Sequence, residues 1–351
     1  MRFLSHCLLL IVLAGCSLQP LQKQPPLYWP ALPATPRVVY ETTLRNSDSI
    51  RIPDAESRLQ KIAVNNGVDP HEWLVKPYDV AARDGLIIVS DTLLSVVHVF
   101  DIRHKRLFAI GWRGKGKLIK PLGVALDNKL NIYVADAGLK TVVKYDSRGH
   151  FLRTIGNPGD FSRIADVAVS PVNQWVYVLD RGGVDSQNHR FKIYSQHGKL
   201  IKTVGTRGAA PGDFNHPTQI ATDKKGRVYV LDSGNFRVQI FTADGKLIRA
   251  WGKLGQSLGD FARPRGLAVS DEFYIFVSDS AFQNFQIFNE SGQLLLNIGQ
   301  GGGADLPGRY MLPAGIAVDE TGRIYVVDQM RQKIDVFRLL KEKEINALLK
   351  K

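Results

Sequence analysis

The chain has 351 residues, 44% of them hydrophobic, and a formal net charge of +13 at pH 7. Its mean hydropathy of −0.11 argues against a protein that crosses a membrane many times. The positive charge favours acidic partners or surroundings, such as anionic lipid, polysaccharide, nucleic acid or an acidic protein.

The N-terminus predicts export. Arg2 precedes an apolar segment, Leu8 to Leu13, that is too short to span a bilayer, and the small residues Ala14 and Gly15 stand before Cys16. This arrangement resembles the lipobox of bacterial lipoproteins. The resemblance implies removal of residues 1–15 and attachment of a diacylglyceryl group to the Cys16 sulfur. We therefore expect a lipid-anchored protein of the cell envelope.

Cysteine usage agrees with this expectation. The removed segment contains Cys7, so the mature chain keeps one cysteine and forms neither an internal disulfide nor a cysteine-based metal site. Ser17 follows Cys16, and by resemblance to Gram-negative lipoproteins this favours the outer membrane. Residues 16–36 contain six prolines and are predicted to be an extended spacer.

The rest of the chain is built from a repeated pattern. A strand is predicted at 37–44 and a short helix at 54–63, before apolar runs that each end in an aspartate. These aspartates are Asp91, Asp136, Asp180, Asp232, Asp279 and Asp328. Later in each of the first five repeats stands a glycine, at Gly111, Gly156, Gly205, Gly252 and Gly299. Such spacing indicates one structural unit that is repeated.

Most units open on a proline followed by a short apolar strand, as in Pro121-Leu-Gly-Val-Ala; the third unit has Ile164 in the proline position. Four strands in roughly 45 to 50 residues is typical of a β-propeller blade. The pattern P-x-G-I-A-V-D, I-Y-V-x-D and G-x-L-x-x-x-I-G resembles the NHL repeat family over about residues 76–337. This resemblance implies an all-β, six-bladed propeller of four-stranded antiparallel blades.

The sixth unit lacks its outer strand. We predict that the strand at 37–44 fills this place, because an open ring would leave sheet edges unpaired. The propeller then covers residues 37–338, and residues 339–351 form a short C-terminal helix.

The repeated aspartates are interpreted as structural, because a carboxylate at a hairpin turn accepts hydrogen bonds from nearby backbone amides. Candidate ligand-binding residues lie after the opening prolines, where they are expected to face the channel mouth. They are Tyr78, Asp79, Asp166, Thr218, Gln219 and Arg265. These side chains either hold a polar ligand or a cation, or only hydrate the channel.

Two further segments are candidates for partner binding. The first is the basic loop 112–120, where the alternatives are a binding surface or a solvated loop in which Trp112 packs inward. The second is the insertion 181–189, which lengthens the hairpin of the third unit. The candidate residues are Trp112, Arg113, Lys115, Lys117, Arg181, Asp185 and His189.

No metal-ligand spacing of histidines and no G-x-S-x-G nucleophile motif occurs in the sequence, and we expect no cofactor. Some six-bladed relatives are lyases or lactonases with a channel metal, but their ligand motifs do not match here. Nucleic acid is not expected for an exported lipoprotein. The sequence therefore favours a module that binds an envelope protein or acidic glycan, and the alternative is a metal-dependent hydrolase or lyase.

Overall fold

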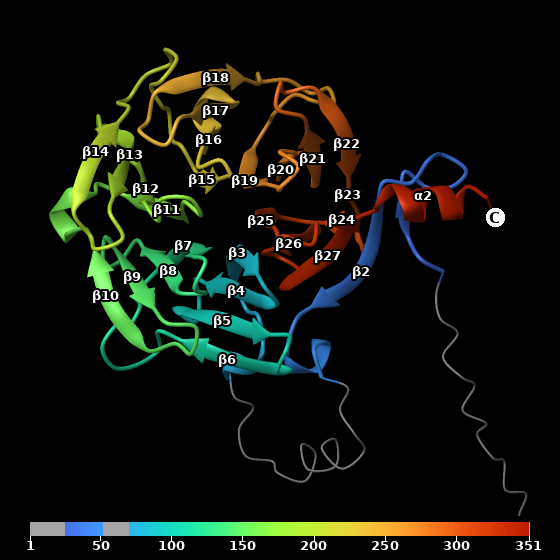
Figure 1. Ribbon diagram of the computed structural model, residues 1–351, viewed down its shortest axis with the longest axis horizontal. Helices are drawn as coiled ribbons and strands as arrows, with labels where there is room; N and C mark the ends of the chain where they lie inside the picture. The colour runs from blue at the N-terminus through green and yellow to red at the C-terminus, as the bar shows by residue number, and fades with distance from the viewer. Residues whose placement is uncertain (1–24, 52–69, 351) are drawn as a thin grey trace, which may run out of the picture.

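The computed structural model describes residues 25–51 and 70–350, which form a six-bladed propeller around a central channel (Figure 1). The predicted fold is thereby confirmed. Cys16, the signal segment and the predicted helix at 54–63 lie outside the described residues.

Five blades are continuous in sequence, and each runs from an inner strand at the channel to an outer strand at the rim. Blade 1 comprises β3 (Pro77–Arg83), β4 (Leu86–Asp91), β5 (Val96–Asp101) and β6 (Arg106–Ile110). Blade 2 comprises β7 (Pro121–Leu126), β8 (Ile132–Asp136), β9 (Thr141–Tyr145) and β10 (Phe151–Ile155). Blade 3 comprises β11 (Ile164–Val169), β12 (Val176–Arg181), β13 (His189–Tyr194) and β14 (Leu200–Val204).

Blade 4 comprises β15 (Gln219–Thr222), β16 (Val228–Asp232), β17 (Arg237–Phe241) and β18 (Leu247–Trp251). Blade 5 comprises β19 (Pro264–Val269), β20 (Ile275–Asp279), β21 (Asn284–Phe288) and β22 (Leu294–Ile298). Four short 3₁₀ turns are η1 (Ser47–Ser49), η2 (Pro70–Glu72), η3 (Pro158–Asp160) and η4 (Ser233–Asn235), and the short strands β23 (Gln300–Gly301) and β24 (Arg309–Tyr310) pair in parallel.

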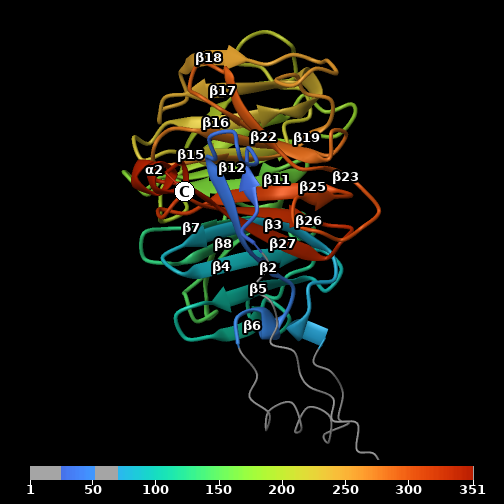
Figure 2. The same cartoon turned by 90° about the vertical axis from the view of Figure 1, so that its right-hand side faces the viewer.

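Blade 6 joins both ends of the chain. Its strands β25 (Pro313–Val318), β26 (Arg323–Asp328) and β27 (Lys333–Leu339) are completed by β2 (Val38–Leu44). The antiparallel register runs from Val38 opposite Leu339 to Leu44 opposite Ile334, and Figure 2 shows β2 beside β27 at the edge of the ring. The predicted closure is therefore correct, and every blade has four strands or more.

One part of the predicted spacer has a structure of its own. Tyr28–Trp29 form β1, which pairs with β2 as a fifth strand, and the Trp29 ring packs against Phe337 at 5.3 Å. The described end of the segment 16–36 is thus attached to blade 6. Trp29 docks on blade 6 because the apolar ring of Phe337 gives it a surface to pack against.

The repeated aspartates tie each blade together. Asp136, for example, accepts hydrogen bonds from the amides of Ile119 and Lys120 in the preceding loop, and from Gly138 and Leu139 in its own turn. All six are fully buried, and every one of them accepts such amide bonds. They hold the loop that enters each blade, as the structural interpretation proposed.

The loops are anchored by aromatic side chains. Gly156, Gly205, Gly252 and Gly299 adopt positive φ, and a β-carbon on them would collide with Phe161, Phe214, Phe261 or Tyr310 respectively. These four rings are buried. Glycine is needed here both for the backbone conformation and for the close approach of a ring. We call the face that carries these loops the loop face, and the opposite side the far face.

The chain ends in α2 (Glu342–Leu348), which begins directly after β27 and lies next to the start of β2, where the Leu340 amide donates to the Arg37 carbonyl. Ile345 is its buried contact, and Arg338 binds Glu344 at 2.9 Å. No helix within residues 25–51 and 70–350 has the length and apolarity needed to cross a membrane.

Candidate functional site

Three polar side chains meet on the channel axis. Gln219 of blade 4 donates a hydrogen bond of 2.8 Å to Asp79 of blade 1, and Asp166 of blade 3 lies beside them. Backbone amides hold both carboxylates, because Val124 donates to Asp79 at 3.0 Å and Ile220 donates to Asp166 at 2.7 Å. At 8% exposure or less, these side chains form a plug across the channel.

The plug fits because the other three blades carry glycine at the same position. A β-carbon on Gly123 would lie 1.8 Å from Asp166 Oδ1, and one on Gly315 would lie 2.3 Å from Asp79 Oδ1. Gly266 is crowded in the same way by the Ala314 carbonyl oxygen at 2.3 Å. The glycines of the repeat therefore make room for the polar residues that replace them elsewhere.

Burial changes the protonation of the plug. Desolvation raises the pKa of Asp79 to about 6. Desolvation also raises the pKa of Asp166 well above its ordinary value, and the neighbouring charge of Asp79 raises it further. The pair therefore retains a proton near neutral pH, which removes the repulsion between two buried carboxylates.

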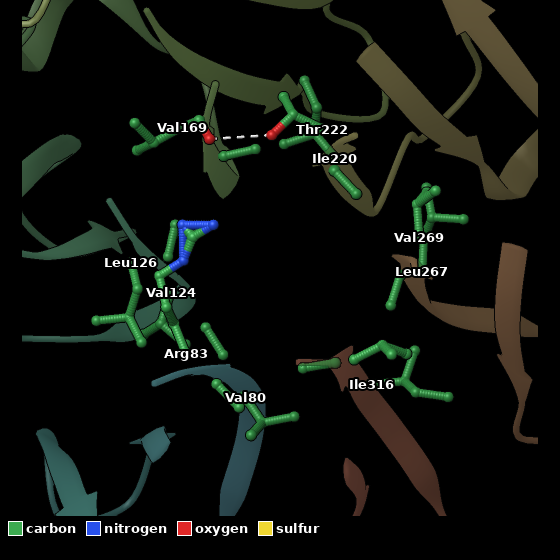
Figure 3. A pocket seen from close by; sticks show the side chains of 18 of the residues that line it. Val80, Arg83, Val124, Leu126, Val169, Ile220, Thr222, Leu267, Val269 and Ile316 are labelled. Atoms are coloured by element: carbon green, nitrogen blue, oxygen red, sulfur yellow. Dashed lines mark hydrogen bonds between the residues drawn. The ribbon is translucent and has the colours of Figure 1, made fainter. Parts of the chain in front are cut away.

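Between the plug and the far face, the channel forms a well of about 310 Å³. Its walls carry apolar side chains from the inner strands, among them Val80, Val124, Ile220, Leu267 and Ile316 (Figure 3), and charged residues such as Asp271 and Glu320 also line it. The Arg83 guanidinium at its rim donates to Asn128 at 2.7 Å. The well thus differs in chemistry from the opposite side of the plug.

On the loop side, a second cavity of about 420 Å³ is basic. We call it the arginine pocket. The residues that line it include Tyr78, Arg181, His216, Thr218, Phe236 and Arg265. The structure therefore separates the predicted channel residues into two groups: Asp79, Asp166 and Gln219 form the plug, whereas Tyr78, Thr218 and Arg265 line the arginine pocket.

The arginines of this pocket have no counter-ion among the described residues. Arg181 and Arg265 make no ion pair there, and Arg181 Nε is buried without a hydrogen-bond acceptor. Burial and the neighbouring charges of Arg163 and Arg265 lower the pKa of Arg181. By contrast, Arg227 on the far face binds both Asp223 and Glu290. The pocket therefore carries positive charge that the chain does not neutralise.

The insertion 181–189 shapes one wall of the pocket. The ring of His189 is fully buried and accepts a hydrogen bond of 3.1 Å from the His216 backbone amide. The prediction that His189 contacts a partner is therefore wrong, because its side chain is enclosed and positions His216 instead. Arg181 lies in the pocket, and Asp185 is exposed at the tip of the insertion.

Sequence reasoning missed His216 and Phe236. Burial lowers the pKa of His216, and so does the nearby positive charge of Arg181, so its imidazole is neutral at pH 7. Phe236 has a φ of 55°, in a turn where other blades place Ser95, Lys140, Gln283 and Gln332 in the same conformation. A bulky aromatic residue is disfavoured in the left-handed region. Comparison of that turn across the repeats would have indicated Phe236.

The basic loop at 112–120 also lies on the loop face. Trp112 is 43% exposed, with the Arg113 guanidinium 4.0 Å above its ring and His71 at 5.6 Å. Lys115 and Lys117 are exposed. The alternative in which Trp112 packs inward is therefore excluded, and this segment and the arginine pocket give the loop face two basic areas.

Within residues 25–51 and 70–350, no three histidine, cysteine, aspartate or glutamate side chains gather in a way that would hold a metal ion. The plug contains two carboxylates, Asp79 and Asp166, which are of a chemical type that binds metal ions. Their oxygen atoms already accept amide hydrogens.

Comparison with known proteins agrees with the fold. The family described as "6-bladed beta-propeller" matches residues 70–192 and 261–347, and the NHL repeat matches residues 214–241. The chain belongs to the 6-bladed beta-propeller family.

Curated relatives each match this chain over a single stretch. Protein brain tumor of Drosophila melanogaster is 27% identical over 121 residues, which are 33% of this chain and 11% of that protein. NHL repeat-containing protein 3 of Mus musculus is 31% identical over 113 residues, which are 28% of this chain and 32% of that protein. The chain thus spans about a third or less of the length of these relatives.

Solved structures share the architecture at low identity. A protein of unknown function from Bacteroides thetaiotaomicron has a TM-score of 0.59 and 18% identity, covering 76% of this chain and 70% of that chain. A streptogramin B lyase has a TM-score of 0.55 and 12% identity, covering 76% and 94%. A gluconolactonase from Xanthomonas campestris has a TM-score of 0.55 and 15% identity, covering 76% and 86%. At these identities the likeness shows the fold alone.

Proposed function

We propose that this propeller is a lipid-anchored binding module of a bacterial envelope, and that its loop face docks an acidic protein or an acidic glycan. The observation that carries the proposal is the unneutralised positive charge of that face. Acidic residues in the loops are mostly engaged locally, as when Asp160 accepts from the Asn157 amide at 2.7 Å. The guanidinium groups of Arg163, Arg181 and Arg265 form no ion pair with an acidic side chain among the described residues.

Lipidation of Cys16 rests on the sequence motif. The first described residues lead into β1, which lies with β2 at the outer edge of blade 6. Two acyl chains give stable membrane anchoring, whereas one gives marginal binding. Radiolabelled fatty acid should enter the full chain and not its Cys16→Ser variant. Equal labelling of both would exclude this anchor.

Binding to the loop face is tested by reversing its charge. Arg113, Lys115 and Lys117 are changed together to glutamate, and binding of the full chain to a polyuronate is measured at several salt concentrations. A matched triple change at Arg148, Lys199 and Lys246, which are exposed in far-face turns, keeps the same net charge. We expect at least a tenfold loss for the loop-face variant alone, with binding that weakens as salt increases.

A protein partner is tested by photo-crosslinking from positions 112 and 185 in intact cells, with position 197 on the far face as control. A discrete adduct from the loop-face positions alone supports a protein partner. The proposal fails if the loop face neither crosslinks to a protein nor binds the polyuronate better than the charge-reversed variant.

The second candidate, a metal-dependent hydrolase or lyase, is favoured by the buried pair of Asp79 and Asp166 on the channel axis. Metal analysis of the purified chain tests it. A stoichiometric metal that is lost in Asp79→Asn, with the fold intact, would favour this candidate over a binding module.

A further inference from the structure

We infer that the arginine pocket binds a single sugar residue that carries an acidic group, either a uronate or a sugar phosphate. This inference deepens the proposed function and rests on it, since it names the chemistry that the centre of the loop face recognises. The acidic group would lie between Arg181 and Arg265, with the hydroxyl groups of the sugar toward Thr218 and His216.

The charges of the pocket call for an oxyanion. The guanidinium groups of Arg181 and Arg265 and that of the nearby Arg163 repel one another, and this cost is relieved when an anion lies between them. Arginine presents a planar set of donors that matches carboxylate and phosphate oxygens in pairs. Arg181 Nε is an unused buried donor, and the Arg265 guanidinium is held 5.7 Å over the ring of Tyr78.

Neutral polar groups beside the arginines suit sugar hydroxyls. Burial raises the pKa of Tyr78, so its phenol remains a donor. Ser233 donates to the Pro264 carbonyl at 3.1 Å and lies 2.5 Å from the Thr218 hydroxyl. The Thr218 proton is therefore directed to Ser233, which leaves the Thr218 oxygen as an acceptor. Neutral His216 adds a group that either donates or accepts.

The size of the pocket and its one aromatic edge also suit a single sugar residue. A volume of about 420 Å³ is near the lower end of the roughly 300–1,000 Å³ typical of small-molecule sites, so one sugar residue fits and a folded partner does not enter. Phe236 lines this cavity in an unfavourable backbone conformation. Its ring therefore offers an apolar contact to one face of the sugar.

Calorimetric titration of the full chain with glucuronate, glucose 6-phosphate, inorganic phosphate and glucose tests the inference. We expect saturable binding of glucuronate or glucose 6-phosphate, and the stronger of the two identifies a carboxylate or a phosphate site. Glucose should bind at least tenfold more weakly, and so should inorganic phosphate. Arg181→Gln and Arg265→Gln should each weaken binding tenfold or more, whereas Arg148→Gln on the far face should not.

Thermal unfolding of each variant, alone and with ligand, separates loss of binding from loss of fold, and Thr218→Val provides a variant without a charge change. The inference is overturned if neither acidic sugar binds saturably, or if Arg148→Gln weakens binding as much as Arg265→Gln does. Binding of the polyuronate at the loop face without binding of either acidic sugar would overturn the inference and leave the proposed function standing. If the chain binds an acidic sugar but its loop face binds neither the polyuronate nor a protein, the inference stands and the proposed function is overturned.

Discussion

Gln219 and Asp79 stand on opposite blades of the ring and are joined by a hydrogen bond of 2.8 Å across the channel. With Asp166 they divide the channel into a well toward the far face, lined by apolar and acidic side chains, and a basic pocket toward the loop face. A solute therefore meets two chemically different cavities rather than a continuous pore.

The plug depends on the glycines around it. Gly123→Ala should destabilise the chain by about 1–3 kcal/mol, because its β-carbon would overlap Asp166. Gly159→Ala is the matched control, since nothing lies within 4 Å of its β-carbon position. Urea denaturation measures both. Combining Gly123→Ala with Asp166→Gly should recover part of the loss, and an additive double variant would contradict the steric explanation.

The buried carboxylates should make stability depend on pH. Their pKa values are raised in the folded state, to about 6 for Asp79, so the folded chain binds more protons than the unfolded chain above their ordinary pKa values. Their contribution is most favourable below about pH 4 and is lost as pH rises through about 6 or higher.

The double variant Asp79→Asn/Asp166→Asn lacks this titration. Relative to wild type, its free energy of unfolding should improve by about 2 kcal/mol between pH 5 and pH 7.5, as measured in urea. Asp185→Asn, at an exposed position, is the control and should follow the wild-type curve. A double variant whose pH dependence parallels the wild type would show that the plug does not hold a proton.

Ring closure should be essential to folding. A chain that begins at residue 45 loses β1 and β2, including the buried Val38 and Leu44, and leaves β27 as an open edge. We expect it to lose its cooperative thermal transition, whereas a chain that begins at residue 25 keeps it. Circular dichroism and calorimetry compare the two. A sharp transition for the shorter chain would show that three strands suffice for blade 6.

Ligand binding should strengthen on acidification. The pKa of His216 is lowered by burial and by nearby cations, and an anion in the pocket would raise it again. By linkage, affinity for glucuronate should increase about threefold to tenfold between pH 7.5 and pH 5.5. Glucuronate is suitable because its carboxylate stays ionised in this range. In His216→Gln the affinity should be independent of pH, and an unchanged dependence would contradict this role of His216.

The repeated pattern was sufficient to predict the blades, the structural role of Asp136 and its equivalents, and the use of 37–44 to close the ring. Those features follow from local turn chemistry and from a missing strand. The sequence placed Tyr78 and Asp79 in one site, although the plug separates neighbouring residues of one strand into different cavities. His189 was predicted to bind a partner because the sequence does not show which side chains of an insertion turn inward.

The arginine pocket was harder to predict. Arg181 and Arg265 lie in strands β12 and β19, whereas His216 and Phe236 lie in the loop and the turn that flank blade 4 strands, and each departs only slightly from the repeat. Their proximity exists only once the ring has formed. The charge of the loop at 112–120 was visible in the sequence, whereas the exposure of Trp112 depended on where the loop backbone places the ring.

The pairing of β2 with β27 also determines when blade 6 can be completed during folding. The hydrogen bond from Thr43 to Asp335 joins residues 292 positions apart, so the earliest propeller strand to be synthesised waits for one of the last. Blades 1 to 5 are assembled from local contacts, but the closing joint must overcome the entropy of a very long loop. β2 therefore cannot pair with β27 until β27 has been synthesised, and during this interval the edge of β2 that β27 covers stays open to other chains.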